Sequence, residues 1–164
     1  MKRCNFLILL SVLVWIGTGR AMAQGEKGNA SSDLCGIWQM CFYVSSTPDI
    51  PGELKPSNSF KILSNDGRFT NMTVIPNRGA IIIGAGTYKC TSSNAFTEYA
   101  EKNLHLPQLT GGSNEMIYEL KDDDIMFVKF FVKNDEDGNE INSWYYETWK
   151  KVKMPAAYPK DLVR

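Results

Sequence analysis

Short apolar segments that alternate with turn signals are the feature that most constrains the fold of this chain. Between residues 34 and 152, eight segments rich in aromatic and β-branched residues are separated by clusters of Gly, Pro, Asn and Asp. Successive side chains of a strand point to opposite faces, and most of these segments carry apolar residues at every second position. No amphipathic stretch is long enough for the helix of a parallel β-α-β unit. The pattern therefore predicts an all-β chain whose strands follow one another as an antiparallel up-and-down meander.

The expected strands are Leu34–Val44, Ser57–Leu63, Arg68–Ile75, Ala80–Cys90, Ala95–Lys102, Glu115–Leu120, Ile125–Lys133 and Glu140–Val152. The step Asp66-Gly67 between the second and third of these is a strong hairpin signal. Gly84 and Gly86 lie at period two on one strand, where glycine favours the sharp curvature of a barrel. We expect an eight-stranded antiparallel up-and-down β-barrel, which leaves no open edge and encloses side chains or one small ligand. A two-sheet sandwich is the alternative.

The first 23 residues have the pattern of a secretory signal peptide. Lys2 and Arg3 precede an apolar block at residues 6–16, and Ala21-Met22-Ala23 matches the small-x-small cleavage pattern. The apolar block is shorter than the ~20 residues that a spanning helix needs. We expect an exported, soluble protein, periplasmic or extracellular, with no membrane span after signal cleavage.

Cleavage after residue 23 would leave a single domain of 141 of the 164 residues, with 15 basic and 18 acidic residues and a net charge of about −3. This charge gives no basic footprint for nucleic acid. The expected organisation is a signal peptide (1–23), a flexible leader (24–33), the barrel (34–154) and a C-terminal tail (155–164). The proline-rich segment Ser45–Pro56 is a candidate lid over the barrel, with an ordered surface loop as the alternative.

The mature chain contains three cysteines, an odd number for an oxidising compartment. Cys35 and Cys41 share a face of one predicted strand but lie about 20 Å apart, beyond disulfide reach. Either could pair with Cys90, or all three could be reduced thiols that pack as small apolar groups. Their spacing matches no zinc site, so no metal is predicted.

Gly36-Ile37-Trp38 on the first predicted strand resembles the G-x-W signature of lipocalins and the wider calycins. Four later motifs follow it: Asn65-Asp66-Gly67-Arg68-Phe69, Gly86-Thr87-Tyr88, Thr97-Glu98-Tyr99 and Glu147-Thr148-Trp149-Lys150-Lys151. Their order is similar to that of secreted lipocalin-like domains of unknown function from Gram-negative gut bacteria. The resemblance covers residues 34–154 and implies a barrel with an interior pocket, without a known ligand or activity. It also implies closure of one barrel end by Gly36 and Trp38 under a basic residue of the last strand, Lys150 or Lys151.

Side chains that the alternation directs inward form the predicted ligand-binding interior. They are Met40, Phe42, Phe60, Phe69, Asn71, Tyr88, Phe96, Glu98, Met116, Tyr118, Val128 and Phe130. The alternation also places Tyr88 and Ile82 on one face. A carboxylate inside an apolar cavity is costly unless paired, so Glu98 is either a ligand contact or the partner of an interior cation such as Arg68 or a terminal lysine. Alternatively, Glu98 faces solvent. The last strand has aromatic residues on both faces, which leaves its inward side open.

The expected function is binding of a small apolar or amphipathic ligand inside the barrel, without a cofactor. A second hypothesis is a solid-core protein-interaction or structural module with no small-molecule ligand. A third is a barrel enzyme or haem protein that uses His105. His105 is the only histidine and lies in a loop, and no nucleophile, zinc or paired-carboxylate motif accompanies it. We therefore do not expect an enzyme.

Overall fold

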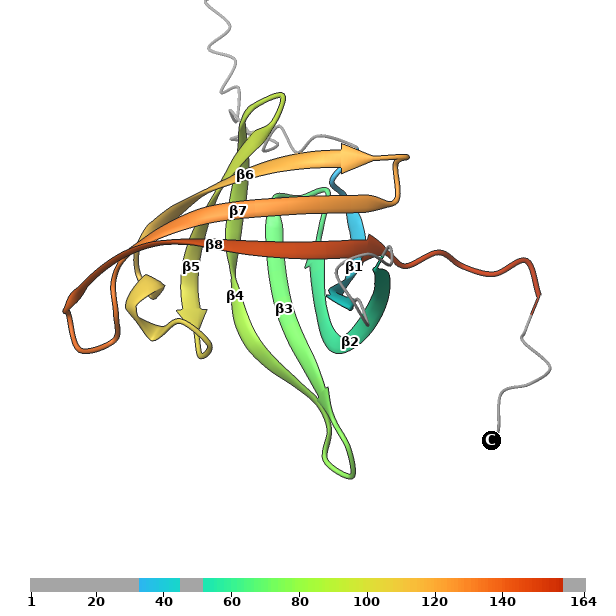
Figure 1. The fold of residues 1–164 in the computed structure, drawn as a ribbon, viewed down its shortest axis with the longest axis horizontal. Helices are drawn as coiled ribbons and strands as arrows, with labels where there is room; N and C mark the ends of the chain where they lie inside the picture. Colours follow the sequence, from blue (N-terminus) through green and yellow to red (C-terminus); the bar gives the residue numbers. More distant parts are fainter. Residues whose placement is uncertain (1–32, 45–51, 158–164) are drawn as a thin grey trace, which may run out of the picture.

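The computed structural model describes residues 33–44 and 52–157, which form a closed barrel of eight antiparallel strands (Figure 1). The strands are β1 (Gly36–Val44), β2 (Glu53–Leu63), β3 (Arg68–Ile75), β4 (Gly79–Ser92), β5 (Ala95–Asn103), β6 (Ser113–Lys121), β7 (Ile125–Asn134) and β8 (Glu140–Lys151), with a short 3₁₀ helix, η1 (Pro107–Leu109), between β5 and β6. Each strand pairs with the next in sequence, and β8 pairs with β1. The predicted up-and-down barrel is confirmed, and the sandwich alternative is wrong.

Several predicted segments lie outside the described residues. They are the signal peptide, all of the leader except Asp33, the last part of the C-terminal tail, and residues 45–51 of the candidate lid. The prediction that the segment is a loop as far as Pro56 is wrong for its last part, because residues 53–56 belong to β2 and pair with the end of β1. Among the described residues, no helix is both long and apolar enough to cross a membrane.

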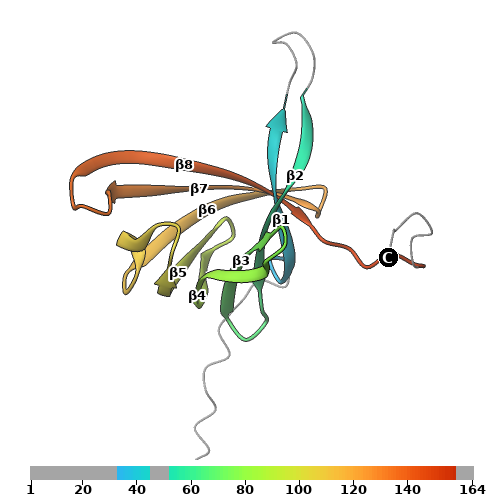
Figure 2. The same ribbon diagram turned by 90° about the horizontal axis from the view of Figure 1, so that it is seen from below.

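The two ends of the barrel differ. The turns that join β2 to β3, β4 to β5 and β6 to β7 lie at one end, which we call the closed end. The connections from β3 to β4, β5 to β6 and β7 to β8 lie at the other, the open end. Figure 1 shows β6, β7 and β8 crossing over the other strands, and Figure 2 shows β1 with β2 and β7 with β8 projecting from the barrel in different directions.

Apolar side chains fill the closed end. The alternation is clearest in β7, where Met126, Val128, Phe130 and Val132 are buried. Every strand adds one buried side chain to a layer that we call the core layer, made of Trp38, Leu63, Phe69, Tyr88, Phe96, Tyr118, Val128 and Trp149. Three of its rings pack against one another, because the Phe96 centroid lies 6.0 Å from that of Tyr88 and 5.8 Å from that of Tyr118. Such aromatic contacts stabilise the layer beyond the area that they bury.

Lys151, and not Lys150, packs over the tryptophan at the closed end. Its Nζ lies 5.1 Å from the centroid of the Trp38 ring and donates to the carbonyl oxygen of Asp33 at 3.0 Å. Gly36 leaves room for this lysine, because a Cβ there would lie 3.1 Å from Lys151 Cε. Gly36 also has a φ of +144°, a conformation that L side chains rarely adopt. The Trp38 indole donates to the carbonyl oxygen of Leu34 at 2.8 Å, so its polar atom is satisfied inside the core.

Two of the register shifts in the sheet correct three predictions. In β4, Ile83 is an extra residue opposite the Asn71–Met72 step, so Ile82 is 60% exposed although Tyr88 is buried. The predicted shared face of Tyr88 and Ile82 is therefore wrong. In β1 the register against β2 shifts between Gln39 and Cys41. Cys41, which simple alternation places on the face opposite Trp38, is buried, and Phe42, expected inside, is 58% exposed although it borders the cavity.

The three cysteines of the barrel are thiols in this structure. Cys35 lies 3.5 Å from the Tyr88 hydroxyl, which donates to the carbonyl oxygen of Ser64 at 2.8 Å. Burial raises the pKa of the Cys41 thiol, so this group is protonated near neutral pH.

Candidate functional site

A cavity of about 550 Å³ occupies the half of the barrel toward the open end. All eight strands and the loop between β5 and β6 contribute to its wall. Its size falls within the range of about 300–1,000 Å³ that is typical of small-molecule sites. The barrel is thus packed at the closed end and hollow toward the open end.

A layer of polar side chains forms the part of the cavity wall next to the core. Because strand side chains repeat with period two, the residue two positions from each core-layer residue, toward the open end, also points inward. At four strands this residue is polar, and the four line the cavity: Lys61, Asn71, Glu98 and Glu147. We call these four residues the polar layer. At other strands the same position is occupied by Met40, Met116 and Phe130.

Lys61 and Glu98 form an ion pair inside the barrel. Lys61 Nζ lies 2.6 Å from Glu98 Oε1, and the two side chains are only 3% and 10% exposed. Burial alone would lower the pKa of Lys61, but the charges of Glu98 and Glu147 and the hydrogen bond to Glu98 raise it, so the amine stays protonated. The ammonium also lies 5.5 Å from the centroid of the Trp149 ring. The predicted pairing of Glu98 with an interior cation is therefore confirmed. The cation is Lys61 and not Arg68 or a terminal lysine, since Arg68 lies 3.7 Å from Glu101 on the surface.

Glu147 brings a second carboxylate to the cavity. Trp149 Nε1 donates to its Oε2 at 2.9 Å, which orients the side chain. Burial raises the pKa of Glu147, and the nearby charge of Lys61 opposes that shift. The inward face of β8, left open by the sequence, therefore carries Tyr145, Glu147 and Trp149, while Trp144 and Tyr146 are exposed.

Asn71 presents an unsatisfied acceptor. Its Oδ1 is buried and has no hydrogen-bond partner among the described residues. Asn71 pairs across the sheet with Lys61 on one side and Gly84 on the other. A Cβ at Gly84 would lie 3.3 Å from Asn71 Nδ2, so the glycine leaves space for the amide. A buried acceptor without a donor costs about 1–3 kcal/mol, which a ligand that donates a hydrogen bond would recover.

The part of the cavity farther toward the open end is mainly apolar and aromatic. The Phe130 and Tyr145 rings stack with centroids 5.4 Å apart, and Ile83, Leu106 and Leu109 complete the wall. The loop that contributes the two leucines is held by Asn103, whose Oδ1 accepts from the backbone N–H groups of His105 and Leu106 at 3.1 and 2.8 Å. His105 itself is exposed and lies at the cavity wall.

The structure divides the predicted interior residues into two groups. Seven line the cavity: Met40, Phe42, Phe60, Asn71, Glu98, Met116 and Phe130. The other five belong to the core layer below it: Phe69, Tyr88, Phe96, Tyr118 and Val128. Lys61, Glu147 and Tyr145 line the cavity and were not predicted.

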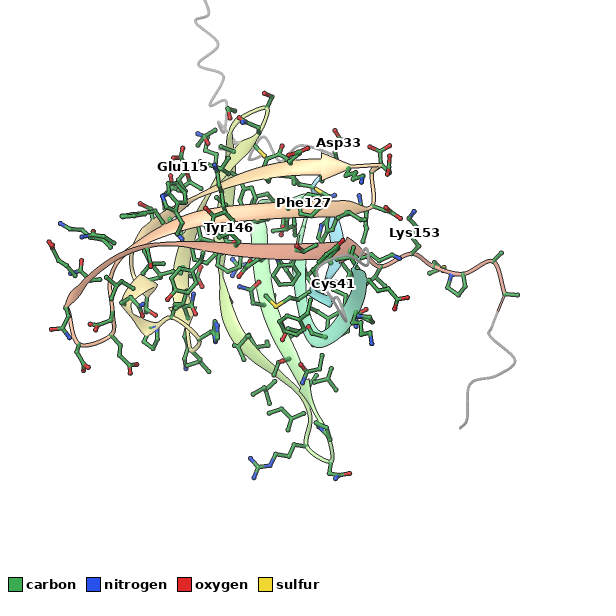
Figure 3. The ribbon with its side chains drawn as sticks, viewed as in Figure 1. Asp33, Cys41, Glu115, Phe127, Tyr146 and Lys153 are labelled. Carbon is green, nitrogen blue, oxygen red and sulfur yellow. The ribbon has the colours of Figure 1, made fainter. Side chains whose placement is uncertain are left out.

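Aromatic side chains also cover the outer surface of β7 and β8. Phe127, Phe131, Trp144 and Tyr146 are between 39% and 75% exposed, and we call them the outer aromatic face. Figure 3 labels Phe127 and Tyr146 on these neighbouring strands. The Phe131 and Trp144 rings meet edge to face at 5.4 Å, and Lys129 Nζ lies 5.4 Å from the Trp144 ring centroid.

Comparison with known proteins places the whole barrel, including the cavity, in one family. No curated protein matches the chain. A family model described as a domain of unknown function, DUF4488, matches residues 33–160, which span every strand from β1 to β8. The chain therefore belongs to the DUF4488 family.

Proposed function

We propose that this protein binds a small apolar or amphipathic molecule in the barrel cavity, and that its role is binding without catalysis. The observation that carries the proposal is the cavity of about 550 Å³ above a fully packed core layer. A barrel whose only task is mechanical or adhesive has no need for a hollow that contains a buried ion pair and an unsatisfied amide oxygen.

The proposal extends to a lipocalin-like, exported protein. Lys151 over Trp38 supports the lipocalin-like part, because a basic residue of the last strand over the first-strand tryptophan is the arrangement that the G-x-W resemblance implies. The basic, apolar and small-x-small pattern of residues 1–23 supports export.

A pair of tryptophan variants on β4 tests the proposal. Ile83 lines the cavity, whereas its neighbour Ile82 is 60% exposed on the outside of the barrel. We expect the neutral apolar dye N-phenyl-1-naphthylamine to bind the wild-type protein and Ile82→Trp with rising fluorescence. Ile83→Trp fills the cavity and should weaken dye binding at least about tenfold. Equal binding by the two variants would place the dye elsewhere and contradict the proposal.

Native mass spectrometry of the protein purified from its own host gives a second test. A bound molecule of defined mass that is absent from Ile83→Trp and present in Ile82→Trp is the expected result. The same adduct on both variants would show that the molecule binds outside the cavity.

The outer aromatic face favours a second candidate function, contact with another protein. Four exposed aromatic side chains on adjacent strands are the kind of apolar surface that a partner covers. Self-association is the form of this function that the isolated protein can show. Sedimentation velocity should then detect a dimer that Phe131→Ser with Trp144→Ser abolishes, and a monomer at every concentration would contradict it.

A further inference from the structure

We propose that the cavity selects amphipathic molecules with a protonated amine head group, which donates hydrogen bonds to Asn71 Oδ1 and pairs with the Glu147 carboxylate. This inference rests on the proposed ligand-binding function and names the chemical class of its ligand. The amine would lie in the polar layer, and the apolar part of the ligand would extend toward the open end.

The charges of the polar layer favour a cation. The layer holds one ammonium, Lys61, and two carboxylates, Glu98 and Glu147, so its ionised form carries one negative charge in excess. Lys61 is already engaged, since its Nζ lies 2.6 Å from Glu98 Oε1. A ligand ammonium would balance the excess charge, whereas a ligand carboxylate would meet two like charges and an ammonium that already has a partner.

The hydrogen-bonding capacity of the layer points the same way. The unsatisfied atom of Asn71 is an oxygen, which accepts and cannot donate. A primary ammonium offers three donors, a hydroxyl offers one, and a carboxylate offers none. The amine is therefore the head group that satisfies Asn71 Oδ1 and also retains a donor for a carboxylate oxygen.

Glu147 is positioned for the second contact. The indole of Trp149 donates to its Oε2 at 2.9 Å and holds the carboxylate at the cavity wall. Burial raises the pKa of Glu147, which means that the neighbouring groups of the barrel do not fully compensate the ionised carboxylate. A bound ammonium would supply that compensation.

The apolar half of the cavity accommodates the rest of the molecule. Beyond the polar layer, toward the open end, Ile83, Leu106 and Leu109 line the wall together with the Tyr145 ring. Each methylene group that the cavity removes from water there strengthens binding through the hydrophobic effect. The ligand class is thus an alkyl or aryl amine, with its head group next to the core layer and its tail toward the open end.

Three probes with one tail and different head groups test the inference on the wild-type protein. Titration calorimetry at neutral pH and low salt would compare decylamine, decan-1-ol and decanoate, each below its micellar concentration. We expect decylamine to bind at least about tenfold more tightly than either of the others. Equal or tighter binding of decanoate or decan-1-ol would overturn the inference and leave the ligand-binding function standing. Failure of all three probes and of N-phenyl-1-naphthylamine would overturn both.

A matched pair of carboxyl variants on β8 tests the assigned contact. Glu147→Gln keeps an acceptor for the Trp149 indole and removes the charge, so decylamine should bind about tenfold more weakly while decan-1-ol is unaffected. Glu140→Gln alters an exposed carboxylate of the same strand and should change neither affinity. Unchanged decylamine affinity in folded Glu147→Gln would contradict the assigned contact. Near-UV circular dichroism reports the fold, and the three-probe comparison on the wild-type protein does not depend on it.

Discussion

Lys61 and Glu98 form an ion pair whose contribution to stability depends on both partners being present. Lys61→Met would leave Glu98 buried without its cation, and we expect the free energy of unfolding to fall by about 3–5 kcal/mol. The double variant Lys61→Met with Glu98→Leu removes both charges and should recover most of that loss. Urea denaturation of the single and double variants measures both effects.

The surface pair Lys133–Glu140 is the control for this prediction. Its atoms lie 3.8 Å apart and its side chains are 67% and 64% exposed, so Lys133→Met should cost less than about 1 kcal/mol. If the double variant is as unstable as Lys61→Met alone, the loss comes from packing and not from an uncompensated charge.

Glu147 should make the stability of the barrel depend on pH. Burial raises its pKa above the ordinary value of 4.5, so the folded protein holds this proton more tightly than the unfolded chain does. The resulting stabilisation is complete below the unfolded pKa and is lost as the pH rises through the folded pKa. Glu147→Gln removes that loss, and its melting temperature should exceed the wild-type value at pH 7.5 and approach it at pH 4. Thermal denaturation across this range that shows a less stable variant at pH 7.5 would contradict the prediction.

Single residues of the site differ in how far the sequence predicts them. Asn71 and Glu98 follow from simple alternation within their strands. Lys61 could have been found as well, because pairing across the turn at residues 64–67 places it opposite Asn71. Glu147 could not, since β8 has aromatic residues on both faces and only the partner strands decide which face is inward. The burial of Cys41 and the high exposure of Phe42 were not predicted, because a register shift is invisible to a period-two pattern.

At the scale of elements, β4 depends on Gly86. A Cβ at this position would lie 2.1 Å from the carbonyl oxygen of Tyr99, an atom of the β5 backbone that cannot rotate away. Gly86→Ala should therefore separate two strands at a register shift and lower the free energy of unfolding by about 3 kcal/mol. Guanidinium denaturation with an unchanged midpoint would contradict this.

Gly84→Ala is the matched control for Gly86→Ala on the same strand. Its nearest contact would be 3.3 Å from Asn71 Nδ2, the end of a side chain that can adjust. We expect a loss below about 1 kcal/mol. If Gly84→Ala loses much less stability than Gly86→Ala, the loss at Gly86 comes from the clash with the β5 backbone. It then does not come from adding a methyl group to β4 in general.

The strands were predicted well because their signals are local. Alternation and turn residues predicted all eight strands, and β3 agrees at both ends, Arg68 and Ile75. The early start of β2 was missed, because prolines predict a loop locally while pairing with β1 carries the strand on to Glu53. The bulge at Ile83 was missed for the same reason, since it is a property of the pairing between β3 and β4.

At the scale of the whole molecule, the sequence could not decide between a hollow and a solid barrel. In an eight-stranded barrel the inward side chains either fill the interior or leave a cavity. Which of the two occurs depends on the sizes of the side chains in each layer. The core layer is filled by large rings such as Trp38, Phe96 and Trp149. Toward the open end, Gly84 has no side chain and the extra residue Ile83 widens β4. The cavity of about 550 Å³ is therefore a consequence of three-dimensional register that no single strand encodes.

In a barrel that is packed at one end and hollow at the other, local unfolding should require less free energy at the hollow end. Amides of β2, β3 and β5 beside the core layer, such as those of Leu63, Phe69 and Phe96, are released only when the core unfolds, so their exchange with solvent should be slowest. Amides around the cavity near the open end have fewer buried contacts and should exchange faster. Hydrogen–deuterium exchange measured by mass spectrometry, peptide by peptide, checks this gradient.

N-phenyl-1-naphthylamine should slow exchange only in the open-end peptides of the wild-type protein and should have no such effect on Ile83→Trp. Uniform protection along every strand would contradict the prediction, because it would mean that the strands around the cavity are locally as stable as those around the core layer.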